Sequence, residues 1–136
     1  MDYERPSSAD AQQIGASARY SLGSCHGSGA GDGNRTQAAS AINPVIYSEL
    51  SIGFARIEEL KAVIKEASLA IEDIPREALF LAGKAFLRYR RSRGTKRSVL
   101  PDFYIGAHAA VMQWPLLTRD AVHYRTYFPT VSVIAP

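Results

Sequence analysis

The sequence predicts an α/β fold with a mainly parallel sheet, and two observations support this prediction. Within residues 42–136, short apolar segments of strand length alternate with longer segments whose hydrophobic residues recur at helical spacing. Such alternation is typical of a parallel sheet that is flanked by helices. The chain has 136 residues, of which 46% are hydrophobic and 21% are charged, so it offers material for a single domain with one core.

Residues 1–41 have a different composition. They contain six of the ten glycines, many serines and alanines, and few large aliphatic side chains beyond Ile14 and Leu22. A segment of this kind buries too little apolar surface to offset the entropy of ordering. We therefore expect a low-complexity, disordered leader over residues 1–41 and a folded domain over residues 42–136.

Each expected element has a local signal. Asn43 followed by Pro44 is a strong helix start, and Asp73-Ile74-Pro75 opens another helix that should end near Gly94. Helices are expected over residues 44–54, 56–67, 76–91, 102–112 and 120–127. Short strands are expected over residues 69–71, 99–100, 115–118 and 131–134.

Bulk properties narrow the class of protein. The single cysteine, Cys25, has no partner for an intramolecular disulfide or a thiolate metal site, and no apolar window approaches the length of a membrane-spanning helix. We therefore expect a soluble, cytoplasmic protein without a membrane partner. The net charge of +3 suits a phosphate-bearing partner but does not require one. No Gly-rich turn joins a strand to a helix within residues 42–136, which disfavours a nucleotide-binding domain.

Three carboxylates stand where solubility alone would not place them. On a helical wheel Glu49 falls on the apolar face of its helix, although it could also be a first-turn acid that favours the helix dipole. Asp102 begins a helix after an apolar pair, and Asp120 follows a strand, so both could simply be helix caps. Strand ends in a parallel sheet can nevertheless bring such acids into one crevice. Three gathered carboxylates would need a hard cation such as Mg²⁺ or Mn²⁺, which points to phosphodiester hydrolysis.

Four strings in residues 42–136 resemble, in order and spacing, the PIN domain of VapC-type toxin ribonucleases: INPVIYSEL, IPREALFLAGKAF, LPDFYIGAHAAV and PLLTRDAVHYRTYFPTVSVIAP. The resemblance implies a Rossmann-like parallel sheet flanked by helices. It also implies an RNA-cleaving activity that requires Mg²⁺ or Mn²⁺, a cognate antitoxin that blocks the site in a type II toxin–antitoxin system, and a homodimer.

Carried over by position, the resemblance gives Glu49, Asp102 and Asp120 as metal-binding acids and Thr118 as a supporting catalytic residue. Asn43 and His108 fall in matching motifs, but we interpret both as structural: Asn43 as a helix cap and His108 as an ordinary helical histidine. The segment RYRRSRGTKR is a candidate contact for the RNA backbone, although it could equally be a solvated helix end whose arginines complement the dipole. Its candidate RNA-binding residues are Arg88, Arg90, Arg91, Arg93, Lys96 and Arg97.

The chain departs from the family at one place. A PIN domain normally begins with a hydrophobic strand that is central to the sheet and ends in a metal-binding Asp, and no such run precedes Ile42. We therefore expect the usual first central strand to be lacking and nuclease activity to be weak or absent. The alternative is an inactive PIN remnant that binds an antitoxin or RNA. We also hypothesise that residues 1–41 are an out-of-frame reading joined to an authentic PIN body.

Overall fold

The computed structural model describes residues 18–22, 39–97 and 99–135. Five strands form one sheet: β1 (Ala18–Leu22), β2 (Ala39–Ile42), β3 (Leu69–Ile71), β4 (Leu116–Thr118) and β5 (Val133–Ile134). The described residues also form five helices: α2 (Pro44–Ser51), α3 (Ile57–Glu66), α4 (Arg76–Arg91), α5 (Pro101–Met112) and α6 (Ala121–Tyr127). The predicted α/β class is confirmed.

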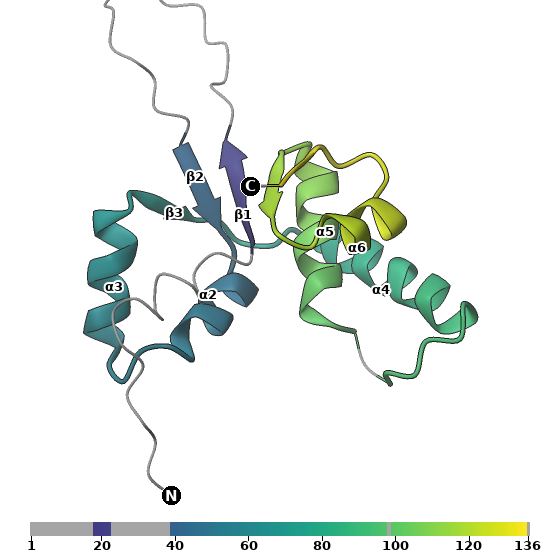
Figure 1. Cartoon of the computed structure of the whole chain (residues 1–136), viewed down its shortest axis with the longest axis horizontal. Helices are drawn as coiled ribbons and strands as arrows, with labels where there is room; N and C mark the ends of the chain where they lie inside the picture. Colours follow the sequence, from purple (N-terminus) through teal and green to yellow (C-terminus); the bar gives the residue numbers. More distant parts are fainter. Residues whose placement is uncertain (1–17, 23–38, 98, 136) are drawn as a thin grey trace, which may run out of the picture.

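The strand order in the sheet is β3-β2-β1-β4-β5. β2 and β3 run parallel to each other, as do β4 and β5, whereas β1 is antiparallel to both of its neighbours. In Figure 1, α3 lies on the β3 side of the sheet, and α4, α5 and α6 gather on the β4 side. The sheet is thus two parallel pairs joined through one central antiparallel strand.

This central strand changes the prediction for the leader. The structure fills the central position with β1, so the sheet has a middle strand, but its direction is opposite to that of a parallel PIN strand. Within residues 1–41, Ala18–Leu22 forms β1 and β2 begins at Ala39, so folded structure starts before residue 42. The remainder of the predicted disordered leader lies outside the described residues.

The helices begin where local chemistry predicts. Asn43 caps α2, because its side-chain oxygen accepts a hydrogen bond from the Ile46 amide at 2.9 Å, and Pro44 takes the first helical position. α5 ends at Gln113, whose left-handed backbone (φ 55°) closes the helix.

One predicted strand is absent. Val99 and Leu100 were expected to be extended in a strand, but neither belongs to the sheet. Leu100 is instead the N-terminal cap residue of α5, with an extended backbone (φ −81°, ψ 152°). The proline that follows disfavours helical geometry at this position, so the extended signal marks a helix boundary and not a strand.

The core lies between the sheet and the helices. Tyr20 and Ile42 from the sheet meet Ile46 of α2, Phe103 of α5 and Tyr124 of α6, all of them almost fully buried. α5 contacts α2, α4 and α6 and is therefore the central helix of the molecule. Among the described residues, every helix is too short or too polar to cross a membrane.

Candidate metal site

The three predicted acids belong to segments that meet at one end of the sheet, where β2 and β4 end. β2 leads directly into α2, which carries Glu49, and β4 leads into the turn that contains Asp120. Asp102 stands in the first turn of α5, the helix that packs against both α2 and α6. Because β1 is antiparallel, its starting residue, Ala18, pairs with Thr118 at this same edge.

Glu49 and Asp102 form a pair of neighbouring carboxyl groups. Both side chains are half-buried. Burial, and after it the negative charge of Asp102, raise the pKa of the Glu49 carboxyl above its ordinary value. In the described part of the chain, the single ion pair joins Arg56 to Glu58, so no cationic side chain compensates these two acids.

The bounds of α2 and α5 decide between the alternative interpretations of Glu49 and Asp102. Glu49 lies in the last turn of α2, so the interpretation as a first-turn acid that favours the helix dipole is wrong. Asp102 follows Leu100 and Pro101 in α5, and the cap position belongs to Leu100, so the interpretation of Asp102 as a helix cap is wrong as well. The sequence signal for a cap was ambiguous because Asp102 is displaced by only two positions.

Tyr124 of α6 contacts the pair through its hydroxyl group. The hydroxyl donates a hydrogen bond to Asp102 Oδ1 with an O···O distance of 3.2 Å, and the side chain is only 2% exposed. Burial, followed by the charge of Asp102, the hydrogen bond to it and the charges of Glu49 and Tyr20, raises the pKa of this phenol. The hydroxyl therefore stays protonated and acts as a donor toward the carboxylate.

Asp120 has a different position. Its carboxylate caps α6 by accepting a hydrogen bond from the His123 amide at 3.3 Å, so the alternative that Asp120 is a helix cap is borne out. Its own amide donates to Thr118 Oγ1 at 3.2 Å, and Thr118 is buried. Over residues 18–22, 39–97 and 99–135, no three Asp, Glu, His or Cys side chains form a group that could hold a metal ion. The structure thus brings Glu49 and Asp102 together and leaves Asp120 outside the pair.

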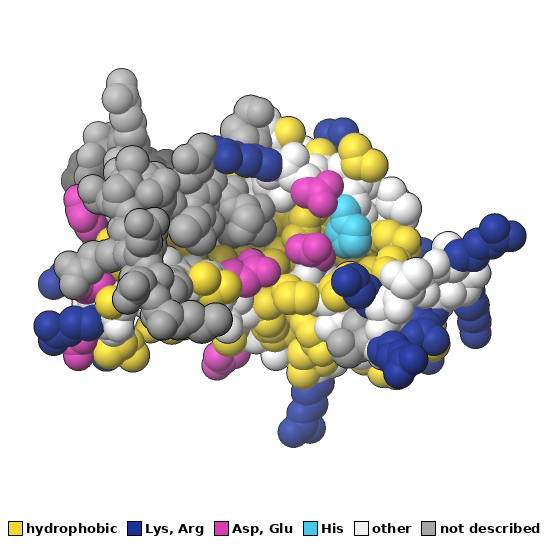
Figure 2. Space-filling model, turned by 60° about the horizontal axis from the view of Figure 1, so that its bottom comes forward, with side chains coloured by type: hydrophobic (Ala, Val, Ile, Leu, Met, Phe, Trp, Pro, Cys, Tyr) yellow, Lys and Arg dark blue, Asp and Glu magenta, His cyan; other side chains and the backbone are white. Residues whose placement is uncertain are grey.

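The donor set of the pair suits a hard divalent cation. It consists of carboxylate oxygens alone, and two adjacent acids without a cationic partner repel each other unless a cation lies between or beside them. Mg²⁺ is commonly held by one or two carboxylates, with water and substrate phosphate as its other ligands. Figure 2 shows acidic side chains close together on one face, beside a histidine and among hydrophobic side chains.

A buried polar cluster of Tyr20, Asn43 and His108 connects the elements next to the acid pair. The Asn43 amide donates to the Tyr20 hydroxyl at 2.5 Å and lies 3.5 Å from His108 Nδ1, while the Tyr20 hydroxyl donates to the Ile105 carbonyl at 3.3 Å. All three side chains are fully buried. The cluster ties β1, the start of α2 and the middle of α5 together, which agrees with the structural roles expected for Asn43 and His108.

The basic segment lies at the end of α4 and in the turn after it. Its six candidate RNA-binding side chains are exposed. The Arg88 guanidinium donates to the Tyr127 carbonyl at 2.5 Å, and Arg90 donates to the Lys96 carbonyl at 2.9 Å. Arg88, Arg90 and Arg91 occupy the last turn of α4, which also fits dipole compensation. Figure 2 shows Lys and Arg side chains around the border of the acidic face.

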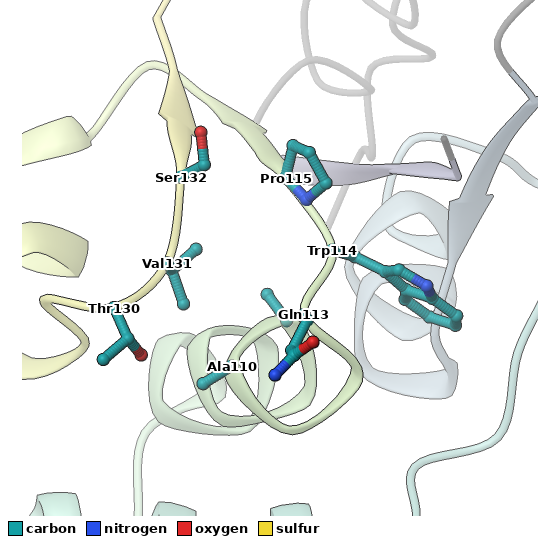
Figure 3. Close-up of a pocket in the computed structure, with 8 residues that line it drawn as sticks. Ala110, Gln113, Trp114, Pro115, Thr130, Val131 and Ser132 are labelled. Atoms are coloured by element: carbon teal, nitrogen blue, oxygen red, sulfur yellow. The ribbon is translucent and has the colours of Figure 1, made fainter. Parts of the chain in front are cut away.

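A hollow at the other end of the sheet has different chemistry. It has a volume of about 380 Å³ and lies where α5 ends and where β4 and β5 begin, as Figure 3 shows. Its lining residues are Ala109, Ala110, Gln113, Trp114, Pro115, Thr130, Val131 and Ser132. None of these side chains is charged, so the hollow has no side chain that could neutralise the charge of a phosphate or of a metal cation.

The sequence does not identify Tyr124 and Tyr20 as residues of the site. Tyr124 was part of a predicted helix, and a tyrosine four residues after Asp120 carries no signal that its hydroxyl reaches another helix. Tyr20 lies in Ala18–Leu22, a short strand inside a segment that composition marked as disordered. The alternation of Ala, Arg, Tyr, Ser and Leu there was the available signal.

The fold agrees with comparisons to known proteins. The PIN domain family model matches residues 34–129. A chain in the crystal structure of VapBC2 from Rickettsia felis bound to a DNA fragment from their promoter is similar in fold, with a TM-score of 0.52 and 20% sequence identity over 70% of this chain and 73% of that chain. No curated protein sequence matches the chain. The family match covers well over half of the 136 residues, and the chain therefore belongs to the PIN domain family.

Proposed function

We propose that this chain is a metal-dependent ribonuclease of the VapC type, the toxin of a type II toxin–antitoxin system, which hydrolyses phosphodiester bonds in RNA. The observation that carries the proposal is the uncompensated pair of Glu49 and Asp102, placed at a sheet edge of a PIN fold. The similarity to a chain of a VapBC2 complex supports the toxin–antitoxin assignment.

Glu49 and Asp102 would hold Mg²⁺ or Mn²⁺ through their carboxylate oxygens. When bound, such a cation lowers the pKa of a coordinated water and stabilises the charge that develops on the phosphate. Asp120 would act from outside the pair, since one of its oxygens serves the α6 cap and the other is left for a ligand. Thr118 supports it by accepting the Asp120 amide hydrogen.

The Arg-rich segment would bind the RNA backbone. Its six basic side chains are exposed, and guanidinium groups form strong hydrogen bonds with phosphate oxygens. Arg88 is already anchored to the backbone of α6, the helix that also carries Tyr124. This anchor would fix the basic segment relative to the acids.

Exposed apolar side chains on three helices would receive the antitoxin and a second copy of the chain. Ile52, at the end of α2, is 67% exposed, Ile57 of α3 is 55% exposed, and Phe80 of α4 is 69% exposed. Exposed hydrophobic surface of this kind commonly marks a protein–protein interface. The proposed partners are therefore RNA, a cognate antitoxin and another protomer.

Activity is expected to be low. A parallel central strand would direct its carboxyl end, with an Asp after it, toward Glu49 and Asp102. In this chain β1 runs the other way, so its carboxyl end, Leu22, pairs with Ala39 where β2 begins, at the opposite end of the sheet. A cation that is held by Glu49 and Asp102 alone should bind more weakly than one that is also held by an Asp after the central strand.

The test is cleavage of a labelled single-stranded RNA by the purified full-length chain. We expect slow cleavage with Mg²⁺ or Mn²⁺, loss of cleavage with EDTA, and loss in Asp102→Asn and Glu49→Gln. Glu59→Gln is the matched control, because it removes one exposed acid of α3 and should leave the rate unchanged. No cleavage with either cation, or cleavage that survives both EDTA and Asp102→Asn, would contradict the proposal.

The direction of β1 also favours a second candidate, an inactive PIN remnant that binds an antitoxin or RNA. The two candidates differ in metal binding. A ribonuclease requires Mn²⁺ or Mg²⁺ binding that depends on Asp102, whereas a remnant does not. Titration of the wild-type chain and of Asp102→Asn with Mn²⁺ therefore separates them.

A further inference from the structure

A hydrogen bond from Tyr124 connects α6 to the acid pair. Tyr124 and Asp102 are 22 residues apart in the sequence, yet the phenol hydroxyl of Tyr124 lies 3.2 Å from Asp102 Oδ1. The tyrosine ring is almost fully buried and lies edge-on to the His123 ring at a centroid distance of 5.6 Å. Because the buried Tyr124 ring is held in place by its packing, its hydroxyl contacts the Asp102 carboxylate from a fixed direction.

The hydroxyl has no evident role in packing. A phenylalanine would fill the same volume in the core, whereas a phenol must place its polar group beside two carboxyl groups in a poorly solvated position. Among the described residues, no other side chain donates a hydrogen bond to Asp102. The orientation of this carboxylate therefore depends on Tyr124.

We infer that Tyr124 is a positioning residue for a divalent cation: it holds Asp102 by one carboxylate oxygen and thereby presents the other to the cation shared with Glu49. The inference rests on the proposed function, because it assumes that these two acids bind Mg²⁺ or Mn²⁺. Hydrogen bonds to metal-binding carboxylates restrict their orientation, and loss of such a partner commonly lowers metal affinity by about 10- to 100-fold.

The experiment measures the dissociation constant for Mn²⁺ with the full-length chain, by the electron paramagnetic resonance signal of free and bound Mn²⁺. The variants are Tyr124→Phe, Tyr127→Phe and Asp102→Asn. Tyr127 is the matched control, because it belongs to the same helix and packs its ring on Phe103 at 5.2 Å, but within the described chain its hydroxyl has no hydrogen bond. Thermal unfolding of each variant checks that it is folded.

We expect Tyr124→Phe to raise the Mn²⁺ dissociation constant by at least about 10-fold and Tyr127→Phe to change it by less than about 2-fold, at similar melting temperatures. If Tyr124→Phe binds Mn²⁺ as tightly as the wild type while Asp102→Asn does not bind it, the positioning role is refuted and the proposed metal site stands. An equal loss in both phenylalanine variants would refute the positioning role too. If the wild type does not bind Mn²⁺, the metal site fails and the positioning role fails with it.

Discussion

Asn43 connects the start of α2 to the buried centre of the molecule, and its replacement offers a quantitative test of the structure. Its side-chain oxygen accepts from the Ile46 amide at 2.9 Å, and its side-chain nitrogen donates to the Tyr20 hydroxyl at 2.5 Å. Loss of a helix cap costs about 1 kcal/mol, and loss of a buried hydrogen bond costs about 1 kcal/mol more. Asn43→Ala should therefore lower the free energy of unfolding by about 2 kcal/mol.

Two further variants separate the contributions. Asn43→Ser keeps an oxygen that can cap the helix but removes the donor to Tyr20, so it should lose only about 1 kcal/mol. Tyr20→Phe removes the acceptor of the same bond, and combining it with Asn43→Ser should cost less than the sum of the two single changes. Ser48→Ala, an exposed change on the same helix, is the control and should stay within about 0.5 kcal/mol of wild type.

The assay is urea unfolding followed by the fluorescence of Trp114, the only tryptophan in the chain. Its ring lies 5.7 Å from the Tyr20 ring and 5.3 Å from the His108 ring, so the probe reports on the cluster itself. With a urea dependence of about 1–3 kcal/mol per molar, a loss of this size moves the midpoint by about 0.7–2 M. A loss under about 0.5 kcal/mol in Asn43→Ala, at an unchanged urea dependence, would refute this account of the cluster.

Three other predictions concern titratable groups. Asp120→Ala should cost about 1 kcal/mol of stability because it removes the α6 cap, whereas Asp120→Asn should keep the cap, and urea unfolding of both checks this. Glu49→Gln should raise the melting temperature at pH 7 without divalent cations, because it removes a partly buried charge and its repulsion from Asp102; the gain should shrink as the pH falls and the Glu49 carboxyl of the wild type takes up a proton, and a gain that persists in acid would contradict the cause. Burial lowers the pKa of His108, so its contribution to stability is full above pH 6.5 and is lost as pH falls below it. Protonation of His108 would also set its Nδ1 hydrogen against the Asn43 amide, and His108→Gln should flatten the stability curve between pH 7.5 and 5.5.

Local chemistry explains how much of the fold the sequence predicts. The cap at Asn43 and the extent of α4 depend on residues within a few positions of each other, and both match the expectation. The same reasoning failed at Val99 and Leu100, where an apolar pair before a proline resembles a strand. A strand also needs a neighbour to pair with, and that information is not local.

The same distinction between local and long-range interactions applies to the candidate site. Glu49 could be identified from the sequence, because the residues of its own helix show that this carboxylate lies on the apolar face. Its proximity to Asp102 depends on the packing of α2 against α5, and the hydroxyl of Tyr124 depends on the packing of α5 against α6. These contacts join residues more than twenty positions apart, so helical periodicity cannot predict them.

The direction of β1 has the largest consequence for function. Tyr20 pairs with Ala41 on one side and Leu116 on the other, so β1 completes the hydrogen bonding of both parallel pairs and supplies the buried phenol of the Asn43 cluster. Its direction, however, places Leu22 opposite Ala39, at the edge of the sheet where β2 begins. A carboxylate after β1 would therefore point away from the acid pair. A strand in this orientation can restore the scaffold of the sheet without restoring a metal ligand, and a cation held by Glu49 and Asp102 would take its remaining ligands from water and from the phosphate of RNA.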